Sequence, residues 1–376
     1  MRPLPLNLLL TADAVGGVFT YALDLARGLA PLGVRTTLVM LGPAMAPHQQ
    51  ATARAVHDVQ VVETGLPLDW LASTPDQILA AAEQVSSLAF AHHADLVHLN
   101  TPALALGDYP CPVTVGLHSC LASWWGTVED GPLPQDFVWR TQLMAEALSR
   151  ADAVLCPTHA FATSVLALYG ASPVVVHNGR AAPRAPLPQI APEATFAFST
   201  GRLWDRGKNA HTLDAAAAQM DVPLLLAGPT VSPQGDAVRL GHAMALGALD
   251  EPAVRAHLAR RPVFVSAALY EPFGLGVLEA AQAGCPLVLS DIPTFRELWH
   301  GAALFVPPRD AEGFAAAVNA VAADERLRRA LGQAAERRAG AYDAQVMAAA
   351  TADLYRALLL RSSTPLDPSS LTGTLA

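Results

Sequence analysis

Residues 271–284, EPFGLGVLEAAQAG, are the segment from which the fold of the chain can be interpreted. They predict a glycine-containing loop and then a helix, with a short apolar strand following at residues 286–290. Gly274 and Gly276 keep large side chains out of the loop, and the first N–H groups of a helix have no partner within it. The start of this helix is therefore suited to bind an anion or a sugar hydroxyl.

Two carboxylates bracket this loop. Glu271 precedes the expected helix and Glu279 lies about one turn inside it, so both can face one cleft. A carboxylate only accepts hydrogen bonds, and vicinal hydroxyls donate two, so the pair suits a polyol that lies beside a phosphate. The spacing alone is equally compatible with a surface helix that carries two solvated glutamates.

The sequence EPFGL, followed from Glu279 by EAAQAGCPLV, resembles the signature of the family-4 retaining glycosyltransferases with the GT-B fold. The resemblance extends over most of the chain. It implies that Glu271 contacts the donor sugar and that Glu279 binds the ribose of the nucleotide. It also implies that the backbone of Phe273, Gly274 and Leu275 approaches the sugar and the diphosphate.

The resemblance implies an α/β fold of the GT-B class. Two Rossmann-like doubly wound domains would face each other across a cleft, and a C-terminal helix would cross back to the first domain. The 376 residues are enough for two domains, each with its own core. We expect an acceptor-side domain at 1–180, a Pro-rich hinge at 181–194, a nucleotide-sugar domain at 195–345, the crossover helix at 346–361 and a mobile tail at 362–376.

Strand-like apolar runs alternate with helical patterns along the chain, which is typical of doubly wound parallel sheets. The expected strands are 6–10, 35–41, 59–62, 96–99, 113–117, 153–155, 174–176, 195–200, 223–227 and 263–266. The expected helices are 18–32, 76–92, 137–150, 160–169, 209–220, a stretch that ends at residue 260, and then 310–323, 325–338 and 342–360.

The composition limits the kind of protein. Hydrophobic residues make up 52% of the chain and charged residues 15%, which indicates a globular protein. No apolar run approaches the roughly 20 residues that span a bilayer, and the first apolar stretch resembles a core strand more than a signal peptide. We therefore expect a cytoplasmic protein.

The charge limits the partners. A net charge of −9 disfavours nucleic acid. The first 180 residues contain no basic run of the kind that docks many relatives on anionic membranes. We expect an acceptor that is soluble or only weakly associated with a membrane.

A second glycine pair, Gly16-Gly17, follows the first expected strand and precedes a helix. This is the end of a strand at which open α/β sheets bind ligands. A dinucleotide fingerprint would require Gly-x-Gly-x-x-Gly and a later acidic residue, so a nicotinamide enzyme is a weak rival. The resemblance places such a Gly-Gly loop against the donor phosphate or the acceptor.

His118 follows the expected strand at 113–117. A lone histidine at a strand end is more often a structural hydrogen bonder, but its position matches the histidine of the family that contacts the donor sugar. Trp124 and Trp125 lie just beyond it and could stack on a sugar ring of the acceptor, although packing under a loop is at least as good an interpretation. Asn100, at the end of another expected strand, is a further acceptor-side candidate.

The run GRLWDRGKN contains the single lysine of the chain, Lys208, among 24 basic residues. A sequence that uses arginine almost everywhere keeps one site for a compact, flexible ammonium. The resemblance assigns Arg202 and Lys208 to the donor diphosphate. We therefore predict that these two residues clamp the phosphates, although a surviving lysine could also be an accident of composition.

No Asp-x-Asp pair, which would hold a metal ion against a diphosphate, occurs in the chain. The four cysteines are scattered without a C-x-x-C pair, which disfavours a zinc site or a disulfide framework and favours free thiols. We predict no metal and no cofactor, with cationic side chains and helix ends neutralising the diphosphate.

Together with these residues, the resemblance implies a retaining hexosyltransferase of the GT-B class that takes a sugar from a UDP- or GDP-linked donor and delivers it to a hydroxyl acceptor, in polysaccharide or glycoconjugate synthesis. Two alternatives remain. One is a GT-B relative with another chemistry on nucleotide sugars, such as an epimerase. The other is a non-catalytic nucleotide-sugar-binding subunit, which would have no reason to keep all the site residues together.

Overall fold

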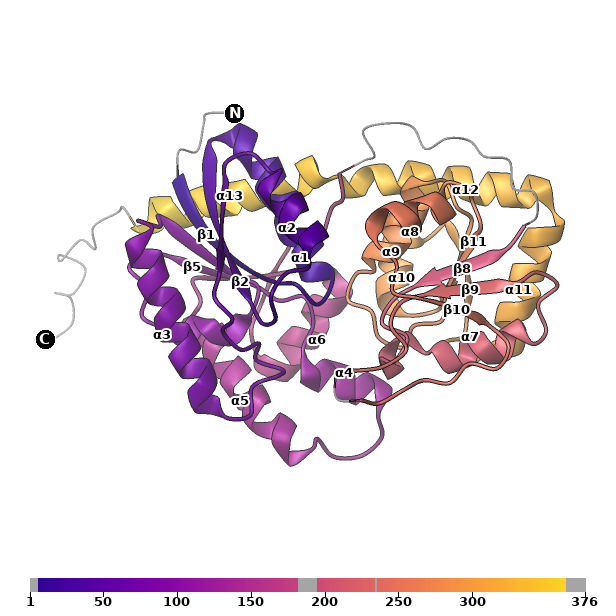
Figure 1. Cartoon of the computed structure of the whole chain (residues 1–376), viewed down its shortest axis with the longest axis horizontal. Coiled ribbons are helices and arrows are strands. Elements are labelled where there is room, and N and C mark those ends of the chain that lie inside the picture. Colours follow the sequence, from indigo (N-terminus) through magenta and orange to yellow (C-terminus); the bar gives the residue numbers. More distant parts are fainter. Residues whose placement is uncertain (1–5, 182–194, 234, 363–376) are drawn as a thin grey trace, which may run out of the picture. The chain divides into compact units, whose positions relative to one another are not determined.

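The computed structural model describes residues 6–181, 195–233 and 235–362, and it is an α/β protein with two parallel sheets (Figure 1). The chain forms two compact units. The first unit takes in the described residues up to Gly116, those from Leu143 to Leu155 and those from Ala348 onward. The second unit consists of the described residues from Leu117 to Gln142 and from Cys156 to Met347.

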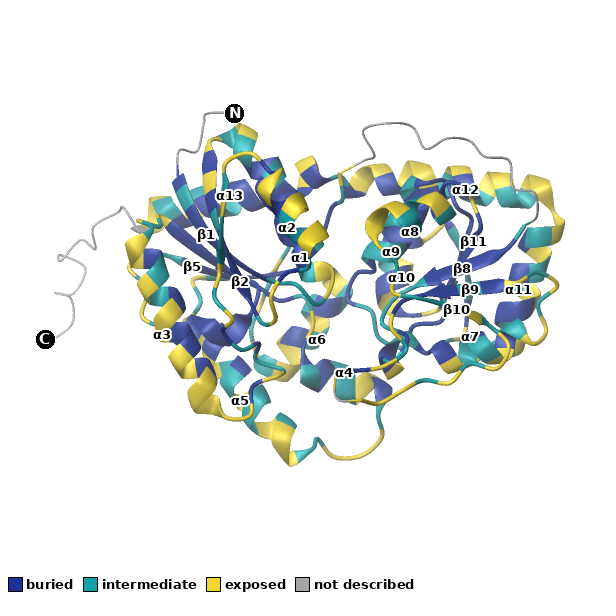
Figure 2. Ribbon diagram, viewed as in Figure 1, coloured by how far each residue is buried: buried dark blue, intermediate teal, exposed yellow. Residues whose placement is uncertain are grey.

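The first sheet has seven strands in the order β3-β2-β1-β4-β5-β6-β7. Their bounds are β1 Leu6–Asp13, β2 Val34–Leu41, β3 Val59–Glu63, β4 Leu96–Leu99, β5 Val113–Gly116, β6 Ala153–Cys156 and β7 Val174–Val175. The ladder between β1 and β2 is parallel and runs in register from Leu6 opposite Val34 to Asp13 opposite Leu41. Every residue of β4 is buried, as expected for a parallel strand covered on both faces. The neighbouring strand β1 is also mostly buried (Figure 2).

The helices of this part of the chain alternate with the strands. They are α1 Gly17–Leu29, α2 Pro47–Arg54, α3 Pro75–Ala91, α4 Leu121–Val128, α5 Gln135–Arg150 and α6 His159–Tyr169, with short 3₁₀ turns at Ala30–Leu32 and Pro102–Leu106. The last helix, α13, spans Ala344–Ser362 and belongs to the first unit from Ala348 onward. Its Tyr355 is fully buried and its hydroxyl lies 2.6 Å from Nδ1 of His98 on β4.

The second sheet has six strands in the order β10-β9-β8-β11-β12-β13. Their bounds are β8 Ala197–Thr200, β9 Leu224–Ala227, β10 Met244–Gly247, β11 Val263–Ser266, β12 Leu287–Ser290 and β13 Ala303–Val306. The helices are α7 Ala210–Ala217, α8 Glu251–Leu258, α9 Leu275–Gln282, α10 Pro293–Trp299, α11 Ala311–Ala323 and α12 Glu325–Ala339, with 3₁₀ turns η3 Arg206–Lys208 and η4 Gly340–Tyr342.

Side-chain alternation along the strands divides the second core in two. On β11, Phe264 belongs to one hydrophobic cluster, and its neighbours Val263 and Val265 belong to another. Because successive side chains of a strand point to opposite faces, the two clusters lie on opposite faces of the sheet, where helices cover them. The helix α9 packs into the same cluster as Phe264 through Val277 and Leu278.

The structure corrects part of the predicted element order. The prediction of a helical stretch that ends at residue 260 is wrong, because that segment contains the strand β10 and only the eight-residue helix α8. The helices α2 and α4 were not predicted. Almost all of the predicted hinge at 181–194 and of the predicted tail at 362–376 lies outside the described residues.

The domain division stays a prediction. The predicted first domain at 1–180 is continuous in sequence, whereas the compact units assign residues 117–142 and 156–180 to the second unit. Residues within these two segments contact the candidate site, which is described next.

Candidate functional site

The candidate site lies at the carboxyl ends of β8 and β9. The chain leaves these strands at Gly201 and Gly228, and a Cβ atom on Gly228 would lie 1.7 Å from the carbonyl oxygen of Gly201. Helix α9 begins beside the same strand end, since a Cβ atom on Gly276 would lie 2.5 Å from Oγ1 of Thr200. Glycine is therefore required at positions 228 and 276, where the backbone comes this close to its neighbours. The approach at Gly276 brings the first N–H groups of α9 to the carboxyl end of β8, the end at which parallel α/β sheets bind ligands.

Gly274 sets the start of α9. It is the N-cap residue with a φ of 93°, a left-handed conformation that favours glycine. A Cβ atom there would lie 3.3 Å from Cγ of Glu271, so the carboxylate-bearing side chain passes close to the turn. The predicted order of loop, helix and strand is confirmed, since α9 and then β12 follow the loop.

Lys208 lies in a tight turn between β8 and α7, formed by residues 205–209 and called here the Lys208 turn. Asp205 caps this turn, with its Oδ1 accepting the N–H of Gly207 at 2.9 Å. Asn209 ends the turn with a φ of 56°, and its side-chain amide donates to the carbonyl oxygens of Ala267 at 2.9 Å and Pro308 at 2.7 Å. The backbone of Lys208 is therefore fixed on both sides.

Lys208 and Glu271 form an ion pair through Nζ and Oε2. Their side chains are 25% and 16% exposed, so solvent screens the pair only in part. The carbonyl oxygen of Gly207 accepts the N–H groups of Leu269 at 2.9 Å and Tyr270 at 3.3 Å. These backbone bonds tie the Lys208 turn to the loop that carries Glu271, and they hold the ammonium and the carboxylate together.

Asp205 is a residue of this site that the sequence analysis did not select. It is only 7% exposed, and its Oδ2 accepts from Nη2 of Arg202 at 3.0 Å. Its Oδ1 also accepts the indole N–H of Trp124 at 2.9 Å. A buried carboxylate requires such donors, so Asp205 orders both partners. The spacing Asp-x-Gly, typical of a capped turn, was the available signal.

The two tryptophans are partly engaged by the protein itself. A Cβ atom on Gly207 would lie 2.8 Å from Nε1 of Trp124, so this indole packs directly on the Lys208 turn. Trp125 donates its indole N–H to the carbonyl oxygen of Gly131 at 3.2 Å and packs edge-on against Phe137. Their stacking on an acceptor sugar stays a prediction.

Tyr270 joins the segment that follows His118 to the loop of Glu271. Its hydroxyl lies 2.7 Å from Oγ of Ser123 and accepts the N–H of Cys120 at 3.3 Å. Burial raises the pKa of Tyr270 well above its ordinary value, so the hydroxyl stays neutral and keeps its hydrogen bonds. The segment of His118 is thereby anchored beside Glu271.

Burial lowers the pKa of His118 from 6.5 to about 4, so the imidazole is neutral at pH 7. The unfolded chain then binds a proton at this residue more readily than the native protein between these two values. The free energy of unfolding should therefore fall as the pH decreases from about 6.5 towards 4. We expect His118→Asn to lose less stability than wild type over this window in urea titrations. Equal losses in both proteins would contradict the assignment.

Glu279 has a different partner from Glu271. Its Oε1 lies 3.2 Å from Nε of Arg180, and its side chain is 28% exposed. The two carboxylates that bracket the glycine loop are thus each paired with a separate cation, Lys208 for one and Arg180 for the other. Their predicted division between sugar and ribose is compatible with this separation.

The protein core holds the rest of the loop formed by residues 271–274, called here the EPFG loop. Phe273 is buried and packs edge-on against Tyr342, so only its backbone is available to a ligand. The carbonyl oxygen of Pro272 accepts from Oγ1 of Thr158 at 3.0 Å, at the start of α6. The loop is therefore held from both sides before any ligand binds.

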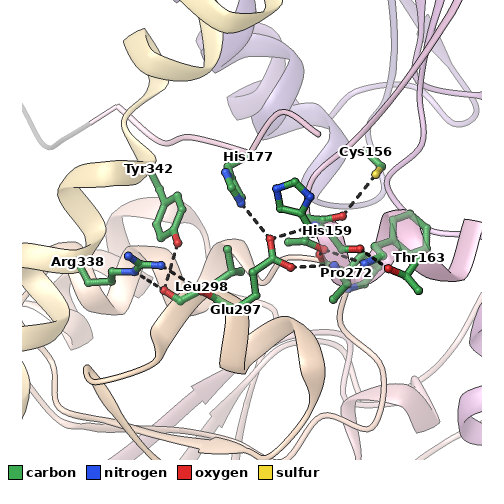
Figure 3. A network of polar contacts seen from close by, with 12 residues as sticks. Cys156, His159, Thr163, His177, Pro272, Glu297, Leu298, Arg338 and Tyr342 are labelled. Carbon is green, nitrogen blue, oxygen red and sulfur yellow. Dashed lines mark hydrogen bonds and ion pairs between the residues drawn. The ribbon is translucent and has the colours of Figure 1, made fainter. Parts of the chain in front are cut away.

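Glu297 strengthens this brace (Figure 3). Its carboxylate accepts the N–H groups of His159 at 2.9 Å and Ala160 at 2.8 Å, and it lies 3.1 Å from Nε2 of His177. Burial alone would raise the pKa of Glu297, but His177 and the two N–H groups lower it overall. The charged carboxylate thus caps α6 next to the residue that holds Pro272.

Three of the predicted residues belong to the first unit. Gly16 is the N-cap residue of α1 and Gly17 is its first residue, in the short loop that follows the strand β1. Asn100 is buried at the end of β4, and its side-chain amide donates to the carbonyl oxygen of Thr11 at 2.7 Å. This amide joins two neighbouring strand ends, which is a structural contribution that a lone asparagine did not reveal in the sequence.

Comparison with known proteins identifies the class. Residues 15–181 match the family described as Glycosyltransferase Family 4, and residues 188–338 match the one described as Glycosyl transferases group 1. A glycogen synthase of Mycobacterium tuberculosis is 30% identical over 291 residues, which cover 70% of this chain and 69% of the relative. The chain therefore belongs to the family-4 glycosyltransferases, as residues 271–288 predicted.

Solved structures show the same fold. Sucrose-phosphate synthase of Thermosynechococcus elongatus superposes with a TM-score of 0.77 at 20% identity, covering 95% of this chain and 100% of that one. HepE of Anabaena, solved with UDP and glucose, gives a TM-score of 0.73 at 20% identity, covering 94% and 100%. The predicted GT-B fold class is confirmed.

The described residues hold neither a metal-binding cluster nor a helix that could span a membrane. They contain no group of three or more His, Cys, Asp or Glu side chains placed to hold a metal ion. No helix within residues 6–181, 195–233 and 235–362 has the length and apolar character needed to cross a membrane. The four cysteines are free thiols, and all but Cys111 are buried.

Proposed function

We propose that the protein transfers a hexose from a nucleotide diphospho-sugar to a hydroxyl acceptor and retains the configuration of the anomeric carbon. The observation that carries the proposal is the pair of Lys208 and Glu271 beside the glycine-lined start of α9. A cation, a carboxylate and helix N–H groups meet at one strand end. This combination suits a donor in which a diphosphate is joined to a polyhydroxylated ring.

Donor binding exchanges the partners of the ion pair. A diphosphate carries more negative charge than one carboxylate, so it takes the ammonium of Lys208 from Glu271. Glu271 is then available to accept hydrogen bonds from sugar hydroxyls. Arg202 contributes in a similar way, because its guanidinium has five N–H donors and is 43% exposed while Asp205 holds one end.

The chemical step separates charge at the anomeric carbon. As the bond to the leaving phosphate oxygen breaks, negative charge develops on the nucleoside diphosphate. Arg202, Lys208 and the N–H groups of α9 stabilise this charge, which is the main catalytic contribution that we assign to the protein. The acceptor oxygen bonds to the same face of the sugar, and the departing phosphate accepts its proton.

A UDP-linked donor is the first to test, because HepE, which shares the fold, was solved with UDP and glucose. The proposal is tested by incubating the purified protein with UDP- and GDP-hexoses and a panel of hydroxyl acceptors. We expect release of the nucleoside diphosphate that depends on the acceptor, with a glycosylated product of unchanged anomeric configuration. An epimerised sugar that appears without any glycosylated acceptor would favour the epimerase alternative. Binding of the donor without any turnover would favour a non-catalytic subunit.

We also propose that the reaction needs no metal ion, since Arg202 and Lys208 supply the positive charge for the diphosphate and the chain has no Asp-x-Asp pair. Transfer activity should persist at its full rate after the protein is treated with EDTA and desalted. Loss of activity on chelation, followed by recovery with Mg²⁺ or Mn²⁺, would show that this part of the proposal is wrong.

A further inference from the structure

Arg180 contacts two carboxylates of the second unit. Its Nε lies 3.2 Å from Oε1 of Glu279, and its Nη2 lies 3.1 Å from Oε1 of Glu251. The Arg180 side chain is only 11% exposed, whereas that of Glu251 is 55% exposed. The guanidinium is therefore held in a defined place and spans from solvent-accessible α8 to the face of α9 that carries Glu279.

The backbone of Arg180 is fixed as firmly as its side chain. Its N–H donates to the carbonyl oxygen of Tyr342 at 3.1 Å, and its own carbonyl oxygen accepts the side-chain amide of Gln282 at 3.1 Å. A Cβ atom on Gly179 would lie 2.3 Å from the carbonyl oxygen of Asp343, so a glycine is needed for this approach. Gln282 and Glu279 are three residues apart on α9 and share a face of it, so Arg180 is attached to that helix at two points.

We propose that Arg180 is a positioning residue that holds the carboxylate of Glu279 in the orientation in which it receives the ribose hydroxyls of the nucleotide. This inference rests on the proposed role of Glu279. A carboxylate has about four lone-pair sites, so Glu279 accepts from Arg180 and still has capacity for a ribose diol. A planar guanidinium that is itself anchored fixes the plane of its partner, which a mobile ammonium does not.

A positioning role of Arg180 differs from a purely structural one in its effect on the ratio of two affinities, that for a ribonucleotide and that for its 2′,3′-dideoxy counterpart. If Arg180 acts through Glu279, its loss weakens binding only when the ligand has ribose hydroxyls for Glu279 to accept. If Arg180 only stabilises the fold, its loss weakens binding of every nucleotide alike. The preference for a ribonucleotide over its 2′,3′-dideoxy counterpart therefore reports on Arg180 independently of overall affinity or stability.

The test is calorimetric titration with UDP and 2′,3′-dideoxy-UDP, and with GDP and 2′,3′-dideoxy-GDP. For hydrogen bonds from ribose to a charged carboxylate, we expect wild type to prefer the ribonucleotide by roughly 10- to 100-fold. Arg180→Ala should lose most of this preference. Arg180→Lys should recover part of it, because an ammonium can pair with Glu279 but cannot reproduce the two-carboxylate fork.

A matched control is Arg255→Ala. Arg255 also contacts Glu251, at 3.8 Å, and is 41% exposed, so its removal takes away a neighbouring arginine that pairs with the same glutamate. This variant should keep the wild-type preference. Arg180→Lys, which keeps the charge, provides a second folded variant if thermal unfolding shows that Arg180→Ala is destabilised.

The titrations distinguish failure of the role inferred for Arg180 from failure of the role proposed for Glu279. An unchanged preference in Arg180→Ala and Arg180→Lys, whether or not both affinities fall, would overturn the inference and leave Arg180 a structural residue. A wild-type protein that binds both forms of the nucleotide equally would instead show that Glu279 does not read the ribose, and the proposed role of Glu279 would fail. Loss of preference in Arg180→Ala together with its persistence in Arg255→Ala supports the inference.

Discussion

Lys208→Arg is expected to fold normally and to lose most of its transfer activity. The aliphatic part of Lys208 lies along Gly201, with its Cγ and Cδ each 3.6 Å from where a Cβ atom on that glycine would be. Its turn is fixed by Asp205 and Asn209, so the backbone cannot shift to accommodate a broader guanidinium. The cation is then misplaced at the leaving phosphate, and such a misplacement costs roughly a hundredfold in rate. Steady-state kinetics with donor and acceptor measure this loss.

Lys208→Ala should be worse than Lys208→Arg and should also bind the nucleoside diphosphate more weakly, because no cation remains at the position. The matched control is Arg206→Lys, a change of cation type in the same turn. Arg206 is 68% exposed and pairs with Glu129, so this variant should keep wild-type kinetics. Wild-type kinetics in Lys208→Arg would show that the single lysine is an accident of composition.

Substitutions of the two glutamates are expected to have different effects, with Glu279 needed for nucleotide binding and Glu271 for turnover. Glu279→Ala should weaken binding of the free nucleoside diphosphate by about 1.5 to 3 kcal/mol, the usual contribution of a hydrogen bond to a charged group. Glu271→Ala should spare or strengthen that binding, because it removes the carboxylate that competes with the diphosphate for Lys208. Its turnover should nevertheless fall, because the donor sugar loses its acceptor of hydrogen bonds.

Calorimetry with the nucleotide alone measures the first effect of each variant, and kinetics with the complete donor measure the second. A useful control is Glu325→Ala, whose carboxylate pairs with Arg329 on the exposed surface of α12 and is 69% exposed. Equal losses of nucleotide affinity in Glu271→Ala and Glu279→Ala would contradict the division.

Local patterns were enough to predict much of the fold. The strands β4 and β11 begin and end where the apolar runs predicted, and α9 begins directly after Gly274. Other elements were missed. Helix α2, PHQQATAR, buries only Ala53, so it has no continuous apolar face. Strand β10, MALG, is a short apolar run without a buried residue, and the sequence analysis placed it in a helix.

The partners inside the site could not be predicted in the same way. Lys208 and Glu271 were each selected, but they are 63 residues apart and their pairing depends on how η3 packs against the EPFG loop. Arg180 was not selected, because a single basic residue in a loop has no periodicity to reveal its burial. For Asp205 the Asp-x-Gly spacing indicates a capped turn, but it does not reveal the contacts with Arg202 and Trp124. Their importance follows only from the tertiary contacts that enclose them.

Arg202 and Lys208 are proposed to hold the diphosphate of the donor. Calorimetric titration of wild type and of the double variant Arg202→Ala/Lys208→Ala with UDP and UMP, and with GDP and GMP, tests this role most directly. Wild type should bind the diphosphate more tightly than the monophosphate of the same nucleoside, because the second phosphate meets the two cations. The double variant should lose this difference while it still binds the monophosphate. A difference of the same size in the double variant would contradict the claim.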